Sequence, residues 1–301
     1  MNRANKKVAI LGGDFRETVL MDALIKKGFS VVAGARDRDI TPESIEVKED
    51  ITEVLKDAQA LILPMTALQK NNRIYTISGK EMYLKEEDLA LLPQGAPVLV
   101  GVANDFLKEA AEKYSLNLLA MANDNAIAIP NAMATAEGAI ALAITESPLL
   151  LAKSIGIIIG YGKVGKALAL RLQALGMQLI VVDKEKEALV EAQKSGFSVM
   201  QKKFCPDIAD QIDFIFNTAP APTITPEIIN KLKKHTLILD IASSPGGTDF
   251  EAAKARGIKA ILASGLPGKY SPYFIGQILT KVYVPIIEKK LAKGVEVNEW
   301  T

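Results

Sequence analysis

Short runs of Val, Ile and Leu alternate with helix-forming segments along the 301-residue chain. Such runs, separated by segments of helical periodicity, are typical of parallel strands joined by crossover helices. In the first half we expect strands at Lys7–Leu11, Ser30–Ala33, Ala60–Leu63, Pro97–Val100 and Asn117–Ala120. In the second half we expect them at Ile155–Ile159, Gln178–Val182, Phe197–Met200, Ile212–Phe216, Thr236–Asp240 and Lys259–Ala263. The second set has the strand number of a complete doubly wound dinucleotide-binding domain.

A segment rich in small apolar residues, NDNAIAIPNAMATAEGAIALAI, lies between the two halves and predicts a long helix. Pro130 and Asn131 can begin this helix, and Pro148 follows its end. We therefore predict an α/β protein with two doubly wound Rossmann-like domains, a linker helix and a C-terminal helix that can cross back to the first domain. The predicted boundaries are 1–125 for the first domain, 126–148 for the linker helix, 149–271 for the NAD(P)-binding domain and 272–301 for the C-terminal helix and tail.

The composition narrows the classes of partner. The chain has 36 basic and 35 acidic residues, whereas nucleic acids and anionic membranes favour a basic excess. No uninterrupted apolar run approaches the length of a transmembrane helix, so no membrane partner is expected. A single cysteine, Cys205, excludes an internal disulfide, and a single histidine gives no basis for a zinc site. We expect a cytoplasmic protein that needs no metal. The oligomeric state stays open, and a homo-oligomer is one possibility.

The segment IGIIIGYGKVGKALALRLQALGMQLIVVD carries the spacing Gly160-x-Gly162-x-x-Gly165. It follows a strand pattern and opens a helix, and the next strand ends at Asp183, where a ribose-binding acid is expected. Gly160 permits the tight turn, Gly162 lets the backbone approach a pyrophosphate, and Gly165 allows close packing of helix on strand. This pattern predicts a dinucleotide site, against the alternative of a turn that uses glycines only for packing.

The choice between NAD and NADP stays open. A carboxylate at Asp183 favours NAD because it repels a 2′-phosphate, whereas Lys184 and Lys186 could serve that phosphate. The segment FNTAP ends the fourth strand of this domain, beside the expected nicotinamide half of the cofactor. The predicted cofactor-binding residues are Gly160, Tyr161, Gly162, Lys163, Val164, Gly165, Asp183, Asn217, Thr218 and Ala219.

The segment ILGGDFRET places Gly12 and Gly13 after the first strand, without a third spaced glycine or a following acid. We do not expect a second dinucleotide site there. Asp14 and Glu17 form a predicted capping box. Arg16 in the first helical turn is unfavourable for the helix dipole, so it either binds a substrate carboxylate or forms a salt bridge.

A second small-residue turn follows the strand that ends at Asp240, in LDIASSPGGTDFEAA. Ligands of doubly wound sheets bind outside the carboxyl ends of the strands. Thr248 and Glu251 form a predicted capping box, which would leave bare backbone at a helix start. The predicted substrate-binding residues are Arg16, Ser243, Ser244, Gly246 and Gly247, and the alternative for this turn is a helix cap without a ligand.

These segments resemble the family of dipicolinate synthase A subunits. The similarity lies in VAILGGDFRE, LILPMT, NDNAIAIPNAMATAEGAIALAI and LDIASSPGGTDFEAAKARGIKAILASGLPGKYSPYFIGQIL, which appear in order over nearly the whole chain. The resemblance implies oxidation of dihydrodipicolinate, a small dicarboxylate, to dipicolinate with NAD(P), usually NADP. It also implies a flavoprotein-like partner, the dipicolinate synthase B subunit, together with a role in the mother cell of a sporulating bacterium.

The catalytic residues stay unknown at this point. His235 precedes a strand, so we expect it in a turn at the edge opposite the ligand. Two-domain 2-hydroxyacid dehydrogenases use a histidine near their last loop, whereas LASGLPGKYSP has none. Tyr161, Lys269 and Tyr270 are candidate proton carriers. Two alternatives to a dipicolinate synthase are therefore open, a 2-hydroxyacid dehydrogenase-like oxidoreductase and a nicotinamide-binding regulatory or scaffold subunit without its own catalysis.

Overall fold

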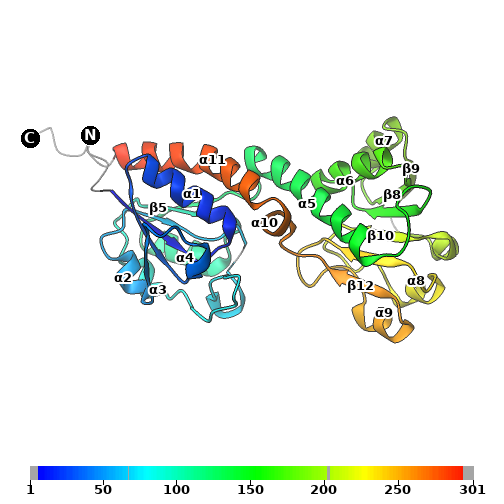
Figure 1. Cartoon of the computed structure of the whole chain (residues 1–301), viewed down its shortest axis with the longest axis horizontal. Helices are drawn as coiled ribbons and strands as arrows, with labels where there is room; N and C mark the ends of the chain where they lie inside the picture. The colour runs from blue at the N-terminus through cyan, green and yellow to red at the C-terminus, as the bar shows by residue number, and fades with distance from the viewer. Residues whose placement is uncertain (1–5, 67, 202–203, 294–301) are drawn as a thin grey trace, which may run out of the picture. The chain divides into compact units, whose positions relative to one another are not determined.

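The computed structural model describes residues 6–66, 68–201 and 204–293 (Figure 1). The chain forms two compact units. One contains the residues up to Pro130 together with those from Ser271 onward, and the other is Asn131–Tyr270. The tail beyond Lys293, which the sequence assigns to the C-terminal segment, lies outside the described residues.

The first unit is built on a parallel sheet of six strands in the order β3-β2-β1-β4-β5-β6. Its strands are β1 (Lys7–Leu11), β2 (Ser30–Gly34), β3 (Glu46–Lys48), β4 (Ala60–Ile62), β5 (Pro97–Val100) and β6 (Asn117–Ala120). Its short helices are α1 (Phe15–Lys26), α2 (Ile51–Leu55), α3 (Glu86–Leu89) and α4 (Asp105–Lys113). In the described part of the chain, 3₁₀ turns also span Arg38–Ile40, Lys70–Asn72 and Pro206–Gln211.

The C-terminal helix α11 (Pro272–Lys293) packs on α1 within the first unit (Figure 1). The approach is close, because a Cβ added at Gly276 would lie 2.5 Å from the Val19 Cβ atom. Further along α11, the buried Tyr283 hydroxyl donates to the Met65 sulfur atom at 3.2 Å. The prediction that the C-terminal helix returns to the first domain is therefore confirmed.

The second unit repeats the architecture with the order β12-β11-β10-β7-β8-β9. Its strands are β7 (Ile155–Ile159), β8 (Gln178–Asp183), β9 (Ser198–Gln201), β10 (Phe214–Asn217), β11 (Leu237–Asp240) and β12 (Lys259–Leu262). Its helices are α6 (Lys163–Ala174), α7 (Lys186–Lys194), α8 (Pro226–Lys231), α9 (Phe250–Arg256) and α10 (Leu266–Tyr270). Apolar side chains of alternate strand residues form separate cores on the two faces of this sheet. The two sheets have the strand order of dinucleotide-binding domains, which confirms the predicted fold class.

The long helix α5 (Asn125–Glu146) begins before Pro130 and Asn131, the residues that the sequence analysis names as a possible start. The Asp124 carboxylate accepts the Ala126 N–H, and Pro130 lies inside the helix rather than at its start. By length and mean hydropathy (1.5) α5 could cross a membrane, but half of its most apolar window is buried in the protein. At Gly138 a Cβ atom would come within 2.9 Å of Leu266 and Tyr270, so the small residues of α5 serve close packing in the second unit.

The sequence analysis misses the strand β3, and it treats as a loop the segment that contains the short helix α10. Strand β3 has three residues, Glu46–Lys48, two of them charged, and it pairs only with β2 at the edge of the sheet. A short charged edge strand carries no apolar alternation, so its pairing is decided by the neighbouring strand. The other predicted strands agree with the observed ones to within two residues at either end.

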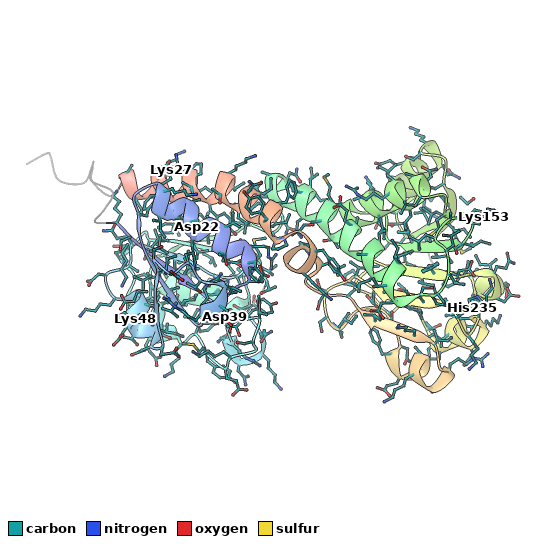
Figure 2. The ribbon with its side chains drawn as sticks, in the orientation of Figure 1. Asp22, Lys27, Asp39, Lys48, Lys153 and His235 are labelled. Carbon is teal, nitrogen blue, oxygen red and sulfur yellow. The ribbon has the colours of Figure 1, made fainter. Side chains whose placement is uncertain are left out.

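Asp213 links the start of β7 to the segment before β11, at the amino ends of the strands of the second sheet. Its carboxylate accepts the Ile155 N–H at the start of β7 (2.9 Å) and the Lys233 ammonium (2.9 Å). His235, 3.6 Å from the same carboxylate and half exposed, lies on the outside of this unit (Figure 2). His235 thus lies in a turn at the amino end of β11, as the sequence analysis expects. Burial alone would raise the pKa of Asp213, but these hydrogen bonds outweigh it and the pKa lies below its usual value.

We expect Asp213→Asn to lower the free energy of unfolding at pH 7 by about 1–2 kcal/mol, because a charge-assisted hydrogen bond is lost. A depressed folded-state pKa adds stability above the unfolded-state pKa, about 4, and this stability is lost as pH falls through the folded-state pKa. The difference between wild type and variant should therefore shrink below about pH 4. Urea unfolding at several pH values measures it. Asp207→Asn, at an exposed ion pair with Lys231, is the control and should change little; a pH-independent loss in D213N would contradict the assignment.

Candidate functional site

The turn between β7 and α6 lies at the point where the strand order of the second sheet reverses, between β7 and β10. This is the position at which doubly wound sheets bind their ligands. The loop after β10 is joined to the turn, because the Thr218 hydroxyl donates to the carbonyl oxygens of Ile159 (3.0 Å) and Gly160 (3.1 Å). The two segments therefore form one hydrogen-bonded edge.

The space available to a side chain differs among the three glycines of this turn. Gly160 has φ +92°, and a Cβ atom there would lie 2.4 Å from the Thr218 hydroxyl oxygen. A Cβ at Gly165 would lie 2.0 Å from the Gly160 carbonyl oxygen, so α6 packs directly on the turn. A Cβ at Gly162 would meet nothing within 4 Å. Packing explains Gly160 and Gly165 but leaves Gly162 unexplained, and Gly162 is the position at which a pyrophosphate approaches the backbone.

The residues present fit a dinucleotide. Gly162 is the N-cap of α6 and supplies no side-chain cap, so the first turn, with Lys163 and Val164, can offer its N–H groups to a phosphate. The partial positive charge at this helix start favours the same anion.

Asp183 ends β8 and is fixed beside the turn. One carboxylate oxygen accepts the Tyr161 N–H (2.7 Å), and the other accepts the Glu185 N–H (2.9 Å). Each oxygen keeps further lone pairs that can accept from a ribose hydroxyl. Lys184 is exposed on the same loop, and Lys186 is exposed at the first position of α7. The structure thus keeps both groups on which the choice between NAD and NADP depends.

Tyr161 requires a correction. Its side chain is buried in the core of the second unit, with its ring edge-on to Phe197 at a centroid separation of 6.1 Å. Its backbone N–H holds Asp183, but the buried ring cannot reach a substrate as a proton carrier. The sequence analysis names Tyr161 as a candidate proton carrier, whereas the ring turns inward to fill the core.

Asn217 also requires a correction. Its side chain is fully buried, donates to the Asp240 carboxylate (3.0 Å) and the Ala219 carbonyl (3.1 Å), and accepts the Ala219 N–H. It therefore shapes the loop after β10 rather than lining a cofactor pocket. Thr218 and Ala219 are half-buried at this edge and stay candidates for contact with the cofactor.

The turn after β11 differs from the predicted carboxylate cradle. The Gly247 N–H donates to the Asp240 carboxylate (2.8 Å), and the Gly246 N–H donates to the Ser243 carbonyl (2.9 Å). These two amides are occupied, so Gly246 and Gly247 do not offer them to a substrate. An internal carboxylate takes the position that the sequence analysis gives to a ligand.

The start of α9 is shifted by one residue from the prediction. Asp249 is the N-cap and accepts the Ala252 N–H, whereas the Thr248 hydroxyl donates to Asp240 at 2.6 Å. The sequence analysis assigned no role to Asp240. A carboxylate that ends a fully apolar strand and precedes two glycines is the signal that could have revealed it.

Ser243 and Ser244 are exposed at the top of this turn and stay candidates for substrate binding. The next loop, after β12, ends in α10, where Lys269 and Tyr270 are exposed and the Lys269 ammonium lies 5.2 Å from the Tyr270 ring centroid. Among the predicted substrate-binding residues and proton carriers that follow β11 and β12, these four have exposed polar side chains.

Arg16, in the first unit, forms the salt bridge rather than an open carboxylate site. Its guanidinium is buried and bonds the Asp14 carboxylate through two nitrogens, at 2.8 and 2.7 Å. Burial alone would lower the pKa of Arg16, but the bonds to Asp14 outweigh it and raise the pKa. The guanidinium therefore stays charged and paired, and the substrate-binding prediction for Arg16 is wrong for this conformation. The capping box of Asp14 and Glu17 is confirmed.

The glycines after β1 serve packing. A Cβ at Gly12 would lie 2.4 Å from both Ile74 and the Tyr75 carbonyl oxygen, and the Gly13 N–H donates to that oxygen (2.8 Å). The protein's own chain thus covers the start of this turn, as it does at Gly160 in the second unit. The position equivalent to Gly162 is Asp14, whose carboxylate already accepts the Arg16 N–H, which is consistent with the expectation that this turn is not a dinucleotide site.

Comparison with known proteins assigns the two units separately. Residues 7–122 match the N-terminal domain of the dipicolinate synthase A subunit, whereas residues 135–242 match the NAD-binding domain of D-isomer specific 2-hydroxyacid dehydrogenases. The second unit is therefore an NAD(P)-binding domain.

Over most of its length the chain is similar to the dipicolinate synthase A subunit of Bacillus subtilis, with 31% identity over 92% of this chain and 94% of that protein. The crystal structure of the dipicolinate synthase A subunit from Bacillus halodurans aligns with a TM-score of 0.85 at 28% identity, covering 95% of this chain and 99% of that one. D-lactate dehydrogenase from Escherichia coli shares the fold, with a TM-score of 0.65 at 14% identity over 96% of this chain and 97% of that one. By the extent of these similarities, the chain belongs to the family of dipicolinate synthase A subunits.

Proposed function

We propose that the chain oxidises dihydrodipicolinate to dipicolinate, pyridine-2,6-dicarboxylate, with NAD(P)⁺ as hydride acceptor. The observation that carries this proposal is the β7–α6 turn, which is packed at Gly160 and Gly165 but open at Gly162. A bound nicotinamide would supply the acceptor for a hydride, and membership of the dipicolinate synthase family supplies the substrate class.

The reaction breaks a C–H bond at a saturated carbon of the dihydropyridine ring. The hydride would be accepted by a bound oxidised nicotinamide, a second hydrogen would leave as a proton, and the ring would become aromatic. Aromatisation favours the product, so positioning of the ring can supply much of the rate acceleration. We infer that the exposed hydroxyls of Ser243 and Ser244 donate to a substrate carboxylate. The proton passes to solvent water, directly or through a deprotonated side chain of Lys269 or Tyr270.

The position of His235 argues against a 2-hydroxyacid dehydrogenase mechanism. That mechanism needs a histidine at the ligand edge, whereas His235 lies beside Asp213 at the opposite end of the sheet. The remaining alternative is an NAD(P)-binding scaffold or regulatory subunit. The names of the relatives denote one subunit of an enzyme, which supports a multi-subunit complex. We propose that the partner is the dipicolinate synthase B subunit and that the complex acts in the mother cell of a sporulating bacterium.

Steady-state oxidation of dihydrodipicolinate, with the purified chain alone and with the B subunit, separates these alternatives. We expect formation of reduced cofactor and dipicolinate in equal amounts, followed by absorbance and chromatography. Absence of both products under both conditions would contradict the enzyme and favour the scaffold.

We expect Gly162→Val to weaken binding of the reduced cofactor by about tenfold or more, because a side chain would enter the space that the pyrophosphate needs. Its melting temperature should stay near that of wild type, since nothing lies within 4 Å of the added Cβ. Gly165→Ala is the contrasting variant, and its clash with the Gly160 carbonyl should lower the melting temperature. Cofactor fluorescence and thermal melts measure both; unchanged affinity in G162V would place the cofactor elsewhere.

We expect Asp183→Ala to weaken binding of NADH by about tenfold, equivalent to about 1.4 kcal/mol, and that of NADPH less. The carboxylate is the acceptor for ribose hydroxyls, whereas it repels a 2′-phosphate. Titration of both reduced cofactors measures the ratio, with Lys184→Ala as the complementary variant that should weaken NADPH more. Equal losses in D183A would assign Asp183 solely to holding the Tyr161 N–H.

A further inference from the structure

Asp240 is a buried carboxylate that is held by neutral hydrogen-bond donors. It is fully buried and accepts from Gly247 N–H (2.8 Å), Thr248 Oγ1 (2.6 Å), Asn217 Nδ2 (3.0 Å) and Ala242 N–H (3.3 Å). Burial of a carboxylate is unfavourable unless its lone pairs are satisfied, and four neutral donors satisfy them here. The Asp240 carboxylate therefore acts as a common acceptor that holds these four donors in place.

These bonds join two loops. Asn217 belongs to the end of β10, whereas Ala242, Gly247 and Thr248 belong to the turn after β11. The backbone completes the connection, because the N–H groups of Thr223 and Ile224 both donate to the Gly247 carbonyl, at 2.9 and 3.0 Å. The loop after β10 in turn holds the Gly160 carbonyl through Thr218. A continuous set of hydrogen bonds thus runs from the Ser243–Ser244 turn to the pyrophosphate turn.

The two glycines of this turn are required by the carboxylate. Gly246 has φ +83°, and a Cβ there would lie 2.8 Å from an Asp240 oxygen. A Cβ at Gly247 would lie 2.1 Å from the Ala221 carbonyl oxygen and 2.8 Å from the Asn217 amide nitrogen. Side chains at these positions would push the turn off Asp240, so the glycines keep the loops in contact and leave Ser243 and Ser244 on the outside.

We propose that Asp240 is a positioning residue that sets the Ser243–Ser244 turn against the nicotinamide edge. The inference rests on the proposed function and deepens it, since these serines are its candidate carboxylate donors. Strands β10, β11 and β12 belong to the half of the sheet that holds the nicotinamide in dinucleotide-binding domains. A misplacement of about 1 Å between reacting groups can slow a reaction about a hundredfold, so loosening this turn should affect turnover more than cofactor affinity.

Asp240→Asn tests the proposal in the full chain with the B subunit. An amide directs an NH₂ group at donors that need an acceptor, so at least one of the four bonds is lost. We expect kcat/KM for dihydrodipicolinate to fall by about tenfold or more, while the Kd of the reduced cofactor changes less than about threefold. Faster hydrogen exchange at the Gly247 amide should accompany the loss. Ser243→Ala with Ser244→Ala should raise the KM for the substrate without faster exchange at Gly247.

Thr248→Val removes one hydroxyl bond without changing shape, and it keeps the test valid if D240N does not fold. Its kcat/KM should fall in the same direction, and Thr248→Ser should restore it because the hydroxyl returns. Thr236→Val is the matched control, since Thr236 is buried, donates its hydroxyl to the Ile212 carbonyl (2.8 Å) and precedes β11 at the opposite edge. T236V should lose stability but keep kcat/KM.

Two failures are distinguishable. A wild-type chain that never reduces the cofactor would contradict the proposed function and the positioning role with it. A wild-type chain that is active, with D240N and T248V matching T236V in both kcat/KM and Gly247 exchange, would contradict the positioning role alone.

Discussion

The turns that follow the parallel strands contain backbone N–H groups that need acceptors. This constraint organises the loops at the carboxyl ends of the strands in each unit. Three aspartates meet it in turn. Asp14 after β1 accepts the Arg16 N–H, Asp183 at the end of β8 accepts the Tyr161 N–H, and Asp240 at the end of β11 accepts the Gly247 N–H. Each fixes a turn that would otherwise have several conformations. At the start of α6 the N-cap is Gly162, which has no such side chain, and there an external anion can supply the acceptor.

The two units share one strand order, but only the second matches an NAD-binding domain. In both units the glycine directly after the first strand is covered, Gly12 by Ile74 and Tyr75 and Gly160 by Thr218. The N-cap two residues later differs, because it is the open Gly162 in the second unit and Asp14 in the first. The difference does not lie in the sheet, which has the same topology in both. It lies at the N-cap of the first helix, where the Asp14 carboxylate accepts the Arg16 N–H in the first unit and Gly162 supplies no side-chain acceptor in the second. A shared architecture therefore does not imply a shared ligand, and the residue at this N-cap distinguishes the two turns.

The turn after β11 illustrates how a structural carboxylate resembles a ligand site in the sequence. Two serines and two glycines after a strand are the composition expected of an anion cradle, and the glycines do cradle an anion. That anion is Asp240, seven residues before Gly247 in the chain. The external face of the turn is left to Ser243 and Ser244. Arg16 follows the same logic, because the acid that neutralises it is Asp14, two residues away.

Local sequence determined the parallel strands, the glycine turn with Asp183, the cap at Asp14 and the place of His235, because each depends on periodicity or on neighbours a few residues apart. The tertiary structure decided the rest. The pairing of β3, the inward ring of Tyr161, the burial of Asn217 and the partners of Asp240 depend on which loops meet at one edge. Residues such as Asn217 and Asp240 are 23 positions apart yet bonded at 3.0 Å. Hydrogen bonds between loops are not encoded by any local pattern, since they exist only once the sheet has brought the strand ends together.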